Sequence, residues 1–511
     1  MSETAATAAA GAPSALRRGH LKLPDVIAQS VSIIAPGMSG GFLTYLAATK
    51  AGGATPLAFV LAAIGALFIG GVVSEFGKSM SSAGSLYTYT ATGWTKTAGF
   101  VVGWMYSLAL IVLGAAVLAG FGLFMSLFVN SLGGADAGFV HWHWFFFGGL
   151  IVVAVMSLFD IRISTQTQLA LTAASVTVMV IAALWVINKG TPAVSVIDGT
   201  TPIAQAGTSI DLGAFWPSAA GVKWSGILLG FAFGILSFTG FEGGAVLAEE
   251  TDNPKHNIPR AVIGSVLAAG VFYILITYAT SLGFGVRQAA IDWPTSAAGL
   301  VAVVTSSALG KLVLIAVAVS ALLCAIGVLN ASARIVFAMG REGVLPRALG
   351  TTHPKWKTPW AALLSTLVLW VVIVFGIVAV VSEGTEAAFT VGAPPEFSGA
   401  FFAFGYWATL ATPAIMFSYL LLGIAGFIKG ERDGNNRLKY SGILAALTGA
   451  LAVVGSLYYS FKEAAPDAGI LTIVKIIPWV NLAAIIIGLA AAAYLRSSKQ
   501  EAWNDMGAVF E

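Results

Sequence analysis

Two apolar segments of this chain are interrupted near their middle, the first at Ser32-Ile-Ile-Ala-Pro-Gly-Met-Ser-Gly-Gly-Phe42 and the second at Phe233-Gly-Ile-Leu-Ser-Phe-Thr-Gly-Phe-Glu-Gly-Gly244. Proline removes a helix hydrogen bond, and each glycine in a helix interior costs about 1 kcal/mol relative to alanine. Both stretches therefore predict that a helix unwinds there. Within a membrane, backbone groups freed in this way are tolerated only where they are buried in protein or line a water-filled cavity. The alternative is that the glycines only let helices pack closely.

The composition places these segments in a membrane. Of 511 residues, 58% are hydrophobic and only 10% are charged, against roughly 25% charged in an average soluble domain. The mean hydropathy is +0.88. A formal net charge of +3 with scattered Lys and Arg argues against a nucleic-acid partner. The single cysteine, Cys324, excludes a disulfide framework, and the five histidines lie between the apolar segments or at their ends, so neither a metal site nor a resident cofactor is expected.

Twelve stretches are long and apolar enough to cross the hydrocarbon, since one helical crossing takes about 20 residues. They are residues 25–48, 55–79, 98–129, 142–159, 167–187, 225–249, 259–285, 311–339, 359–381, 401–428, 440–461 and 473–495.

The distribution of basic residues orients these spans. With twelve spans, 19 of the 26 Lys and Arg fall on the side that holds both termini, and seven fall on the other side. Cytoplasmic loops carry the excess of Lys and Arg, so the sequence predicts a multi-pass protein of the plasma (inner) membrane with cytoplasmic tails at residues 1–24 and 496–511. The seven residues on the outer side are Lys50, Lys189, Lys223, Arg287, Lys311, Lys462 and Lys475.

The two interruptions fall in the first and the sixth predicted spans, which run in opposite directions across the bilayer. This spacing is typical of a five-helix inverted repeat whose discontinuous helices meet at a midplane site. The predicted repeats are residues 25–187 and 225–428, separated by an extracellular loop at 188–224 and followed by two helices within 429–495. Helix ends at such breaks offer N–H groups to a carboxylate and carbonyl groups to an ammonium or metal cation.

Four stretches of the chain resemble the amino acid–polyamine–organocation (APC) superfamily, of the amino acid permease type. The most specific is Ser237-Phe-Thr-Gly-Phe-Glu-Gly-Gly-Ala-Val-Leu-Ala-Glu-Glu-Thr-Asp-Asn-Pro-Lys-His-Asn-Ile-Pro-Arg260, which is similar to the helix 6 signature. The region around Ala83-Gly84-Ser85-Leu86-Tyr87, the stretch from Asn330 to Pro346, and Met38-Ser39-Gly40-Gly41-Phe42 also match, with Met38 where a glycine is usual. The resemblance spans about residues 25–430.

The resemblance implies the LeuT-type fold, an all-α membrane protein of twelve helices in which helices 1 and 6 are broken within a 5+5 inverted repeat and two helices follow. It also implies a secondary active transporter of an amino acid or related amine that works by alternating access. In the family, the helix 1 motif holds the substrate carboxylate and helix 6 carbonyls hold the amine. By residue match, the substrate-binding residues are Met38, Ser39, Gly40, Gly41, Leu236, Ser237, Phe238, Thr239 and Phe241. Phe238 and Phe241 are candidates for a gate or side-chain pocket, with plain packing as the alternative.

Glu242 lies inside the second interruption, and an ionisable residue at membrane depth is a functional hypothesis by default. It could carry a transported proton, pair with a cationic substrate, or anchor the broken helices through hydrogen bonds. At the inner ends of other spans, Glu75 and Lys78 stand three residues apart and predict a local ion pair. Arg334 predicts a side chain that extends to the membrane interface.

The coupling ion stays open at this point. Some family members carry a lysine in helix 5 in place of a sodium ion, whereas this chain has Ser175 near that position. A proton on Glu242 is the first prediction, and a sodium site using Ser175, Ser320 or Ser332, or plain exchange, are the alternatives. A membrane-embedded enzyme or a passive channel would belong to another class, and a lone carboxylate at depth argues against the enzyme. The expected partners are a small amino acid or amine and the lipid bilayer, with the chain a monomer or homodimer.

Overall fold

The computed structural model describes residues 16–132, 140–158, 161–189, 193–194, 202–203, 210–287, 289, 293, 299–304, 307–380, 398–460 and 470–507. The first part of the predicted N-terminal tail, the last four residues and most of the predicted 188–224 loop lie outside the described residues. In the described part of the chain, helices are the main regular elements, beside one short antiparallel pair, β1 (Ala193–Val194) and β2 (Pro202–Ile203), and an isolated bridge between Leu21 and Thr251.

Each predicted span coincides with one helix or with consecutive helical segments. The first five spans correspond to α2 (Leu23–Ile34) with α3 (Pro36–Met38), η1 (Ser39–Leu43) and α4 (Thr44–Ala51), then to α5 (Thr55–Ser79), α7 (Lys96–Leu132), α8 (Trp142–Leu158) and α9 (Ile161–Lys189). The next five correspond to α10 (Trp224–Phe238) with η4 (Phe241–Leu247), then to α11 (Pro254–Phe284), α14 (Ser307–Arg341), α15 (Trp360–Val380) and α16 (Ser398–Arg432). The last two are α17 (Asn436–Tyr458) and α18 (Ile470–Ser498). Short elements complete the chain: η2 (Gly52–Ala54), α6 (Leu86–Gly93), η3 (Leu212–Phe215), α13 (Leu300–Val303), η5 (Arg347–Gly350) and α19 (Gln500–Asp505).

The lengths of these helices fit a multi-pass membrane protein. In the described ranges, nine helical stretches are long and apolar enough to cross a membrane, and two apolar helices, Trp142–Leu158 and Trp360–Gly376, are shorter. One of the nine, Leu23–Ser79, has 57 residues. A single crossing takes about 20 residues, so this stretch is long enough for the first two predicted spans.

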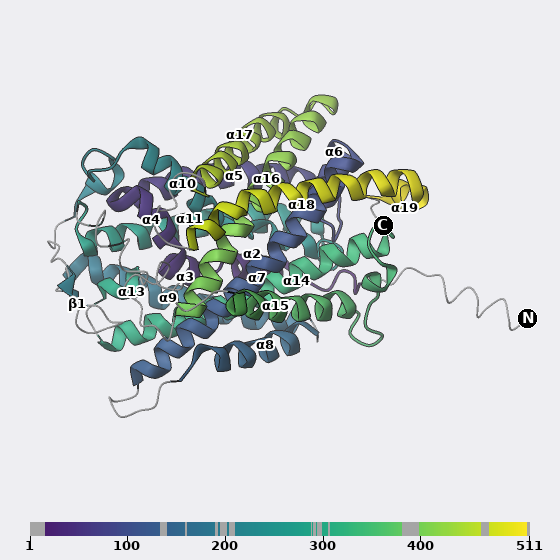
Figure 1. Cartoon of the computed structure of the whole chain (residues 1–511). Helices are drawn as coiled ribbons and strands as arrows, with labels where there is room; N and C mark the ends of the chain where they lie inside the picture. The colour runs from purple at the N-terminus through teal and green to yellow at the C-terminus, as the bar shows by residue number, and fades with distance from the viewer. Residues whose placement is uncertain are drawn as a thin grey trace, which may run out of the picture.

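The predicted inner and outer segments lie at opposite ends of the helical bundle. Figure 1 shows α4, α13 and β1 at one end, and α6 and α19 at the other. We call these the outer and the inner end, following the charge distribution of the sequence.

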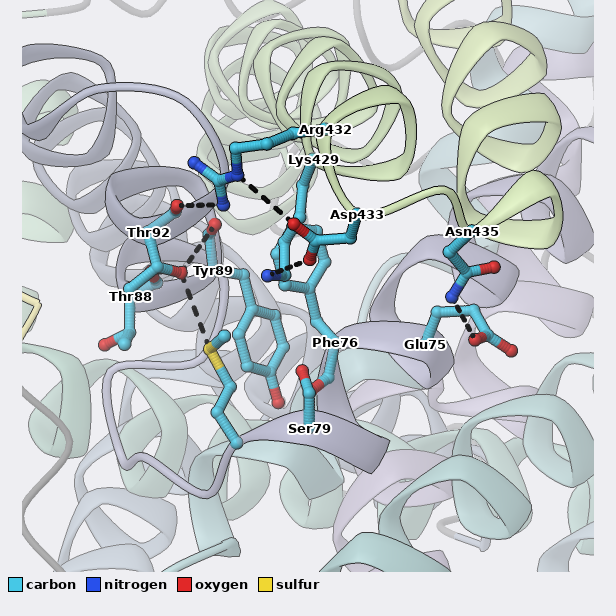
Figure 2. A network of polar contacts seen from close by, with 11 residues as sticks. Glu75, Phe76, Ser79, Thr88, Tyr89, Thr92, Lys429, Arg432, Asp433 and Asn435 are labelled. Carbon is cyan, nitrogen blue, oxygen red and sulfur yellow. Dashed lines mark hydrogen bonds and ion pairs between the residues drawn. The ribbon is translucent and has the colours of Figure 1, made fainter.

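Polar contacts at the inner end join α5, α6, the end of α16 and the turn that follows it (Figure 2). Lys78 pairs with Glu75, which confirms the predicted ion pair. Asn435 Nδ2 donates to the other carboxylate oxygen of Glu75 at 3.2 Å, and Arg432 donates to the Thr92 carbonyl at 3.4 Å. Contacts of this kind near water contribute at most about 1 kcal/mol each, so they fix the ends of the elements more than they hold the bundle together.

The structure contradicts the prediction for Arg334. Its side chain is buried, with 1% exposed, and its Nε donates to Glu250 Oε1 at 2.7 Å. A second buried pair joins Arg341 to both carboxylate oxygens of Glu249, at 2.8 and 3.0 Å. Both glutamates follow η4, so these pairs attach the inner end of the sixth span to α14. The prediction of an interfacial side chain is wrong because Arg334 finds a carboxylate 84 residues away in sequence.

The C-terminal segment folds back onto the inner end of the bundle. Lys96 Nζ donates to the carbonyls of Trp503 and Asn504 at 3.0 and 2.7 Å. Met506 is buried, and the Trp503 side chain packs against the hydrophobic core.

Glu342, which directly follows α14, binds the end of this C-terminal segment. Its carboxylate accepts hydrogen bonds from the Tyr87 hydroxyl and from the Gly507 N–H, the latter at 3.2 Å. Burial raises the pKa of Glu342 to about 7, although these two hydrogen bonds and the charge of Arg341 lower it. The nearby carboxylate of Glu249 raises it further.

We therefore expect the stability of the protein to fall as the pH rises from about 4.5 to about 7. The ordinary pKa of a glutamate is 4.5, so the folded state binds more protons than the unfolded state within this window and is favoured at its acidic end. The loss is about 3 kcal/mol at most and is complete above the folded pKa. Thermal unfolding in detergent across pH 5 to 8 measures it.

Glu342→Gln keeps a neutral side chain and should flatten this pH profile. Glu501→Gln, at an exposed position on α19, is the matched control and should leave the profile unchanged. A Glu342→Gln protein with the wild-type profile would show that other groups set the pH dependence.

Candidate functional site

Both predicted interruptions are present in the backbone. The first span breaks at Ala35, whose φ of +48° ends α2, and Pro36 starts the next short segment. A residue before proline is disfavoured in the α-helical region, which explains the position of this break. The sixth span breaks at Gly240, whose φ of +111° favours glycine, between the end of α10 at Phe238 and the 3₁₀ helix η4.

The two broken helices contact each other at their breaks. A Cβ added to Gly240 would lie 2.2 Å from Ile33 Cγ2, so only a glycine permits this approach. The Ser30 hydroxyl donates to the Phe241 carbonyl at 2.9 Å and accepts from the Gly244 N–H at 3.0 Å. Ile33 meets Gly240 whereas Ser30 meets Gly244, so the two segments run antiparallel.

Side chains from other helices satisfy the carbonyls that the breaks release. The Tyr273 hydroxyl of α11 lies 2.9 Å from the Ile34 carbonyl oxygen and 2.8 Å from that of Ser237, so one group joins both breaks. The Cys324 thiol of α14 donates to the Ile33 carbonyl at 3.2 Å. The protein itself thus supplies the partners that lipid cannot offer.

A cavity of about 30 Å³ lies between the breaks. Four of the nine predicted substrate-binding residues line it: Met38, Ser39, Leu236 and Thr239. The other helices contribute Leu113 and Val117 from α7, Cys324 from α14 and Phe404 from α16. The cavity is narrow in this structure, and we expect the surrounding helices to move apart when a substrate enters.

The two polar side chains that line the cavity differ in their hydrogen bonding. Ser39 is engaged by the backbone, since its N–H donates to the Ala35 carbonyl at 2.8 Å and its hydroxyl donates to the Ile34 carbonyl at 2.9 Å. The Thr239 hydroxyl is buried and lies near the Tyr419 hydroxyl, which Glu242 already binds. A ligand in the cavity could therefore use Thr239 as a polar contact.

The other five predicted residues pack around the cavity and do not line it. They are Gly40, Gly41, Ser237, Phe238 and Phe241. A Cβ on Gly40 would lie 3.0 Å from the Phe272 ring, and one on Gly41 would lie 2.5 Å from Val317. The Phe238 ring packs edge-on against Tyr273 at 5.2 Å between centroids, and Phe241 stacks on Tyr419 at 5.9 Å.

Glu242 is buried beside the second break and is held by three donors. The hydroxyls of Tyr106 and Tyr419 both donate to Oε1, that of Tyr419 at 2.6 Å, and the Gly240 N–H donates to Oε2 at 3.1 Å. Tyr106 belongs to α7 and Tyr419 to α16. The carboxylate therefore ties the break to two further helices and does not line the cavity.

The three hydroxyls proposed for a cation site do not converge. Ser175 and Ser320 both lie against Gly37, because a Cβ there would be 2.5 Å from Ser175 Oγ and 2.8 Å from Ser320 Cβ. The Ser175 hydroxyl already donates to the Ala316 carbonyl at 2.8 Å. Ser332 lies on the same helix as Ser320, about 18 Å further along. Among the described residues, no group of three or more His, Cys, Asp and Glu could hold a metal ion.

Several residues of this site were not among those predicted from the sequence. They include Tyr106, Tyr273, Cys324, Phe404 and Tyr419, as well as Leu113 and Val117. A polar group within an apolar span is a signal that could have drawn attention to the tyrosines and the cysteine, but it does not tell which break each one reaches. Phe404 carries no such signal, because the chain has 31 phenylalanines.

Comparison with known proteins gives a consistent result. A family model described as amino acid permease matches residues 21–489. The chain is 29% identical over 308 residues to the low-affinity putrescine importer PlaP of Escherichia coli strain K12. The aligned region covers 60% of this chain and 64% of the importer, which is just under two thirds of the importer's length. It is 26% identical over 331 residues to the branched-chain amino acid permease BcaP of Bacillus subtilis strain 168, covering 63% and 67% of the two chains. It is also 23% identical over 410 residues to the serine/threonine exchanger SteT of the same strain, covering 72% and 86%.

Removal of the Tyr273 hydroxyl should destabilise the protein. Tyr273→Phe keeps the ring but removes the hydroxyl that donates to the carbonyls of Ile34 and Ser237. A buried polar group left unpaired costs about 1–3 kcal/mol. Thermal unfolding in detergent measures the change. Tyr278→Phe is the control, since Tyr278 lies on the same helix but stacks on Phe215, away from the breaks. If both variants were equally stable, Tyr273 would not hold the breaks together.

Proposed function

Since this chain belongs to the amino acid permease family, we propose that it is a secondary active transporter that moves an amino acid or a related amine by alternating access. The family consists of permeases, so the chain is a transporter and not an enzyme. The names of its relatives refer to putrescine, branched-chain amino acids, serine and threonine, which all carry a primary amine. The observation that carries the proposal is the meeting of two broken helices around one cavity.

The proposed architecture is the LeuT-type arrangement of twelve crossings, with repeats at residues 25–187 and 225–428 and two further helices within 429–495. Its support is the antiparallel approach of the two breaks. The carboxyl-terminal ends of α2 and α10 lie at the cavity through Ile34 and Leu236. These helix ends carry partial negative charge, which suits the ammonium of a substrate.

Alternating access requires the broken helices to move against the rest of the bundle. At the inner end, the pairs Arg334–Glu250 and Arg341–Glu249 join the sixth span to α14. We assign to them the role of an inner gate. Separation of such a pair leaves buried charges unless water enters, so the pairs favour the closed state until the inner path opens and hydrates them.

The proposed coupling ion is a proton carried by Glu242. As a carboxylate it accepts from Tyr106, Tyr419 and the Gly240 N–H, whereas a protonated carboxyl must itself donate from one oxygen. Gain or loss of a proton would therefore change how the break is attached to α7 and α16. A sodium ion beside Ser175 and Ser320 is the second candidate, supported by the position of both residues at Gly37.

Glu242→Gln should abolish accumulation driven by an inward proton gradient and retain exchange. Glutamine imitates the protonated carboxyl, and exchange does not require the proton to leave. Uptake of radiolabelled amino acids into proteoliposomes under imposed proton or sodium gradients measures both activities. Ser320→Ala is the control and should keep proton-driven uptake. Proton-driven accumulation by Glu242→Gln at the wild-type level would remove Glu242 from the coupling mechanism. If the wild-type protein showed sodium-driven uptake and Ser320→Ala lost it, coupling would be assigned to sodium.

Both termini are proposed to lie in the cytoplasm. Cysteines placed at Ser2 or Ser497 in a Cys324→Ser background should resist an impermeant maleimide in intact cells. Serine at position 324 keeps a donor for the Ile33 carbonyl, so the background should fold. Ser218→Cys, exposed in the predicted outer segment, is the positive control and should react. Efficient labelling at either terminal position would reverse the orientation.

A further inference from the structure

Two chemically different groups of residues line the cavity between the breaks. The broken helices contribute the helix ends at Ile34 and Leu236 together with the Thr239 hydroxyl. The surrounding helices contribute Leu113 and Val117 of α7 and the ring of Phe404 of α16, which we call the apolar side. Within the described part of the chain, no charged side chain lines this cavity.

The apolar side is backed by further apolar groups. The Phe404 ring packs on Phe42 at 4.8 Å between centroids, and Phe42 packs edge-on against Phe124 at 5.6 Å. Met38 turns its side chain toward α7, where a Cβ on Gly120 would lie 2.6 Å from Met38 Cε. A polar group that extended past Phe404 would therefore meet rings and a thioether.

The carboxylates near the site are already engaged. Glu242 uses both oxygens for its three donors, and it stands outside the cavity lining. Glu249 and Glu250 are paired with arginines at the inner end. A second ammonium or a guanidinium on the substrate would face the apolar side without a partner, and an unpaired charge at membrane depth costs several kcal/mol.

We infer that the site takes a neutral α-amino acid with an apolar side chain, and does not take a diamine or a cationic amino acid. The inference rests on the proposed transport function and narrows its substrate class. The α-ammonium is placed at the carbonyl ends of α2 and α10, with Thr239 beside it. The aliphatic side chain lies against Leu113, Val117 and Phe404.

The single cysteine of the chain provides a readout at the site itself. Cys324 lines the cavity and is buried, so N-ethylmaleimide reaches it only when the helices move apart, and a bound ligand should alter the rate of this alkylation. The purified wild-type protein is titrated with alanine, valine and leucine, and separately with arginine, lysine and putrescine. Half-maximal protection is measured for each compound, together with competition for uptake into proteoliposomes. We expect valine or leucine to protect at a concentration at least about ten-fold lower than arginine or putrescine.

The outcomes separate this inference from the proposed function. Equal or stronger protection and uptake with putrescine, lysine or arginine would overturn the apolar assignment and leave the transporter intact. Absence of protection, accumulation and exchange with every amino acid and amine of the panel would overturn the proposed function and this inference with it.

A charge placed on the apolar side tests the same assignment from the protein. Val117→Asp adds a carboxylate to the apolar side of the cavity, and Val117→Asn adds a side chain of the same shape without the charge. Relative to Val117→Asn, Val117→Asp should improve protection by lysine or arginine by about ten-fold and weaken that by leucine. Identical preferences in the two variants would show that the substrate side chain does not reach α7. The wild-type titration decides the substrate class even if Val117→Asp fails to fold.

Discussion

Backbone groups released by a break inside the membrane must find partners within the protein, and this constraint organises the centre of the molecule. The carbonyls of Ile33, Ile34 and Ser237 receive donors from α11 and α14. Each such hydrogen bond left unmade would cost about 1–3 kcal/mol, so the breaks are compatible only with a bundle that places these helices around them. The surrounding helices and the two breaks therefore depend on one another.

The sequence predicts the parts of this fold whose causes are local. A hydropathic stretch of about 20 residues predicts a helix, and a proline or a cluster of glycines predicts a break, because each effect acts within a few residues. The partners cannot be predicted in this way. Tyr273 reaches a carbonyl 239 residues away, and Arg334 reaches a carboxylate 84 residues away. Hydropathy located the helix end at which Arg334 lies, but it carried no information about the charge that faces it.

The site shows a second limit of sequence reasoning, which is the direction of each side chain. A contiguous motif such as Met38 to Gly41 winds around a helix, so its members face different neighbours. Met38 and Ser39 line the cavity, whereas the faces of Gly40 and Gly41 meet α11 and α14. The family resemblance therefore points to a segment that borders the cavity, without separating the residues that line the cavity from those that let helices pack.

The hydrogen bonds that hold the breaks also determine what a substrate can change. The Ile34 carbonyl already accepts from Ser39 and lies within reach of the Tyr273 hydroxyl. If a substrate ammonium donates to this carbonyl, a charge-assisted hydrogen bond replaces neutral ones, and such a bond is roughly twice as strong. The Tyr273 link between the two breaks would then weaken as the substrate binds. A ligand shifts a conformational equilibrium only through such a difference in affinity between the states. In the proposed mechanism, the Ile34 carbonyl would both recognise the amine and join the broken helices, so recognition and movement would be coupled without a separate relay.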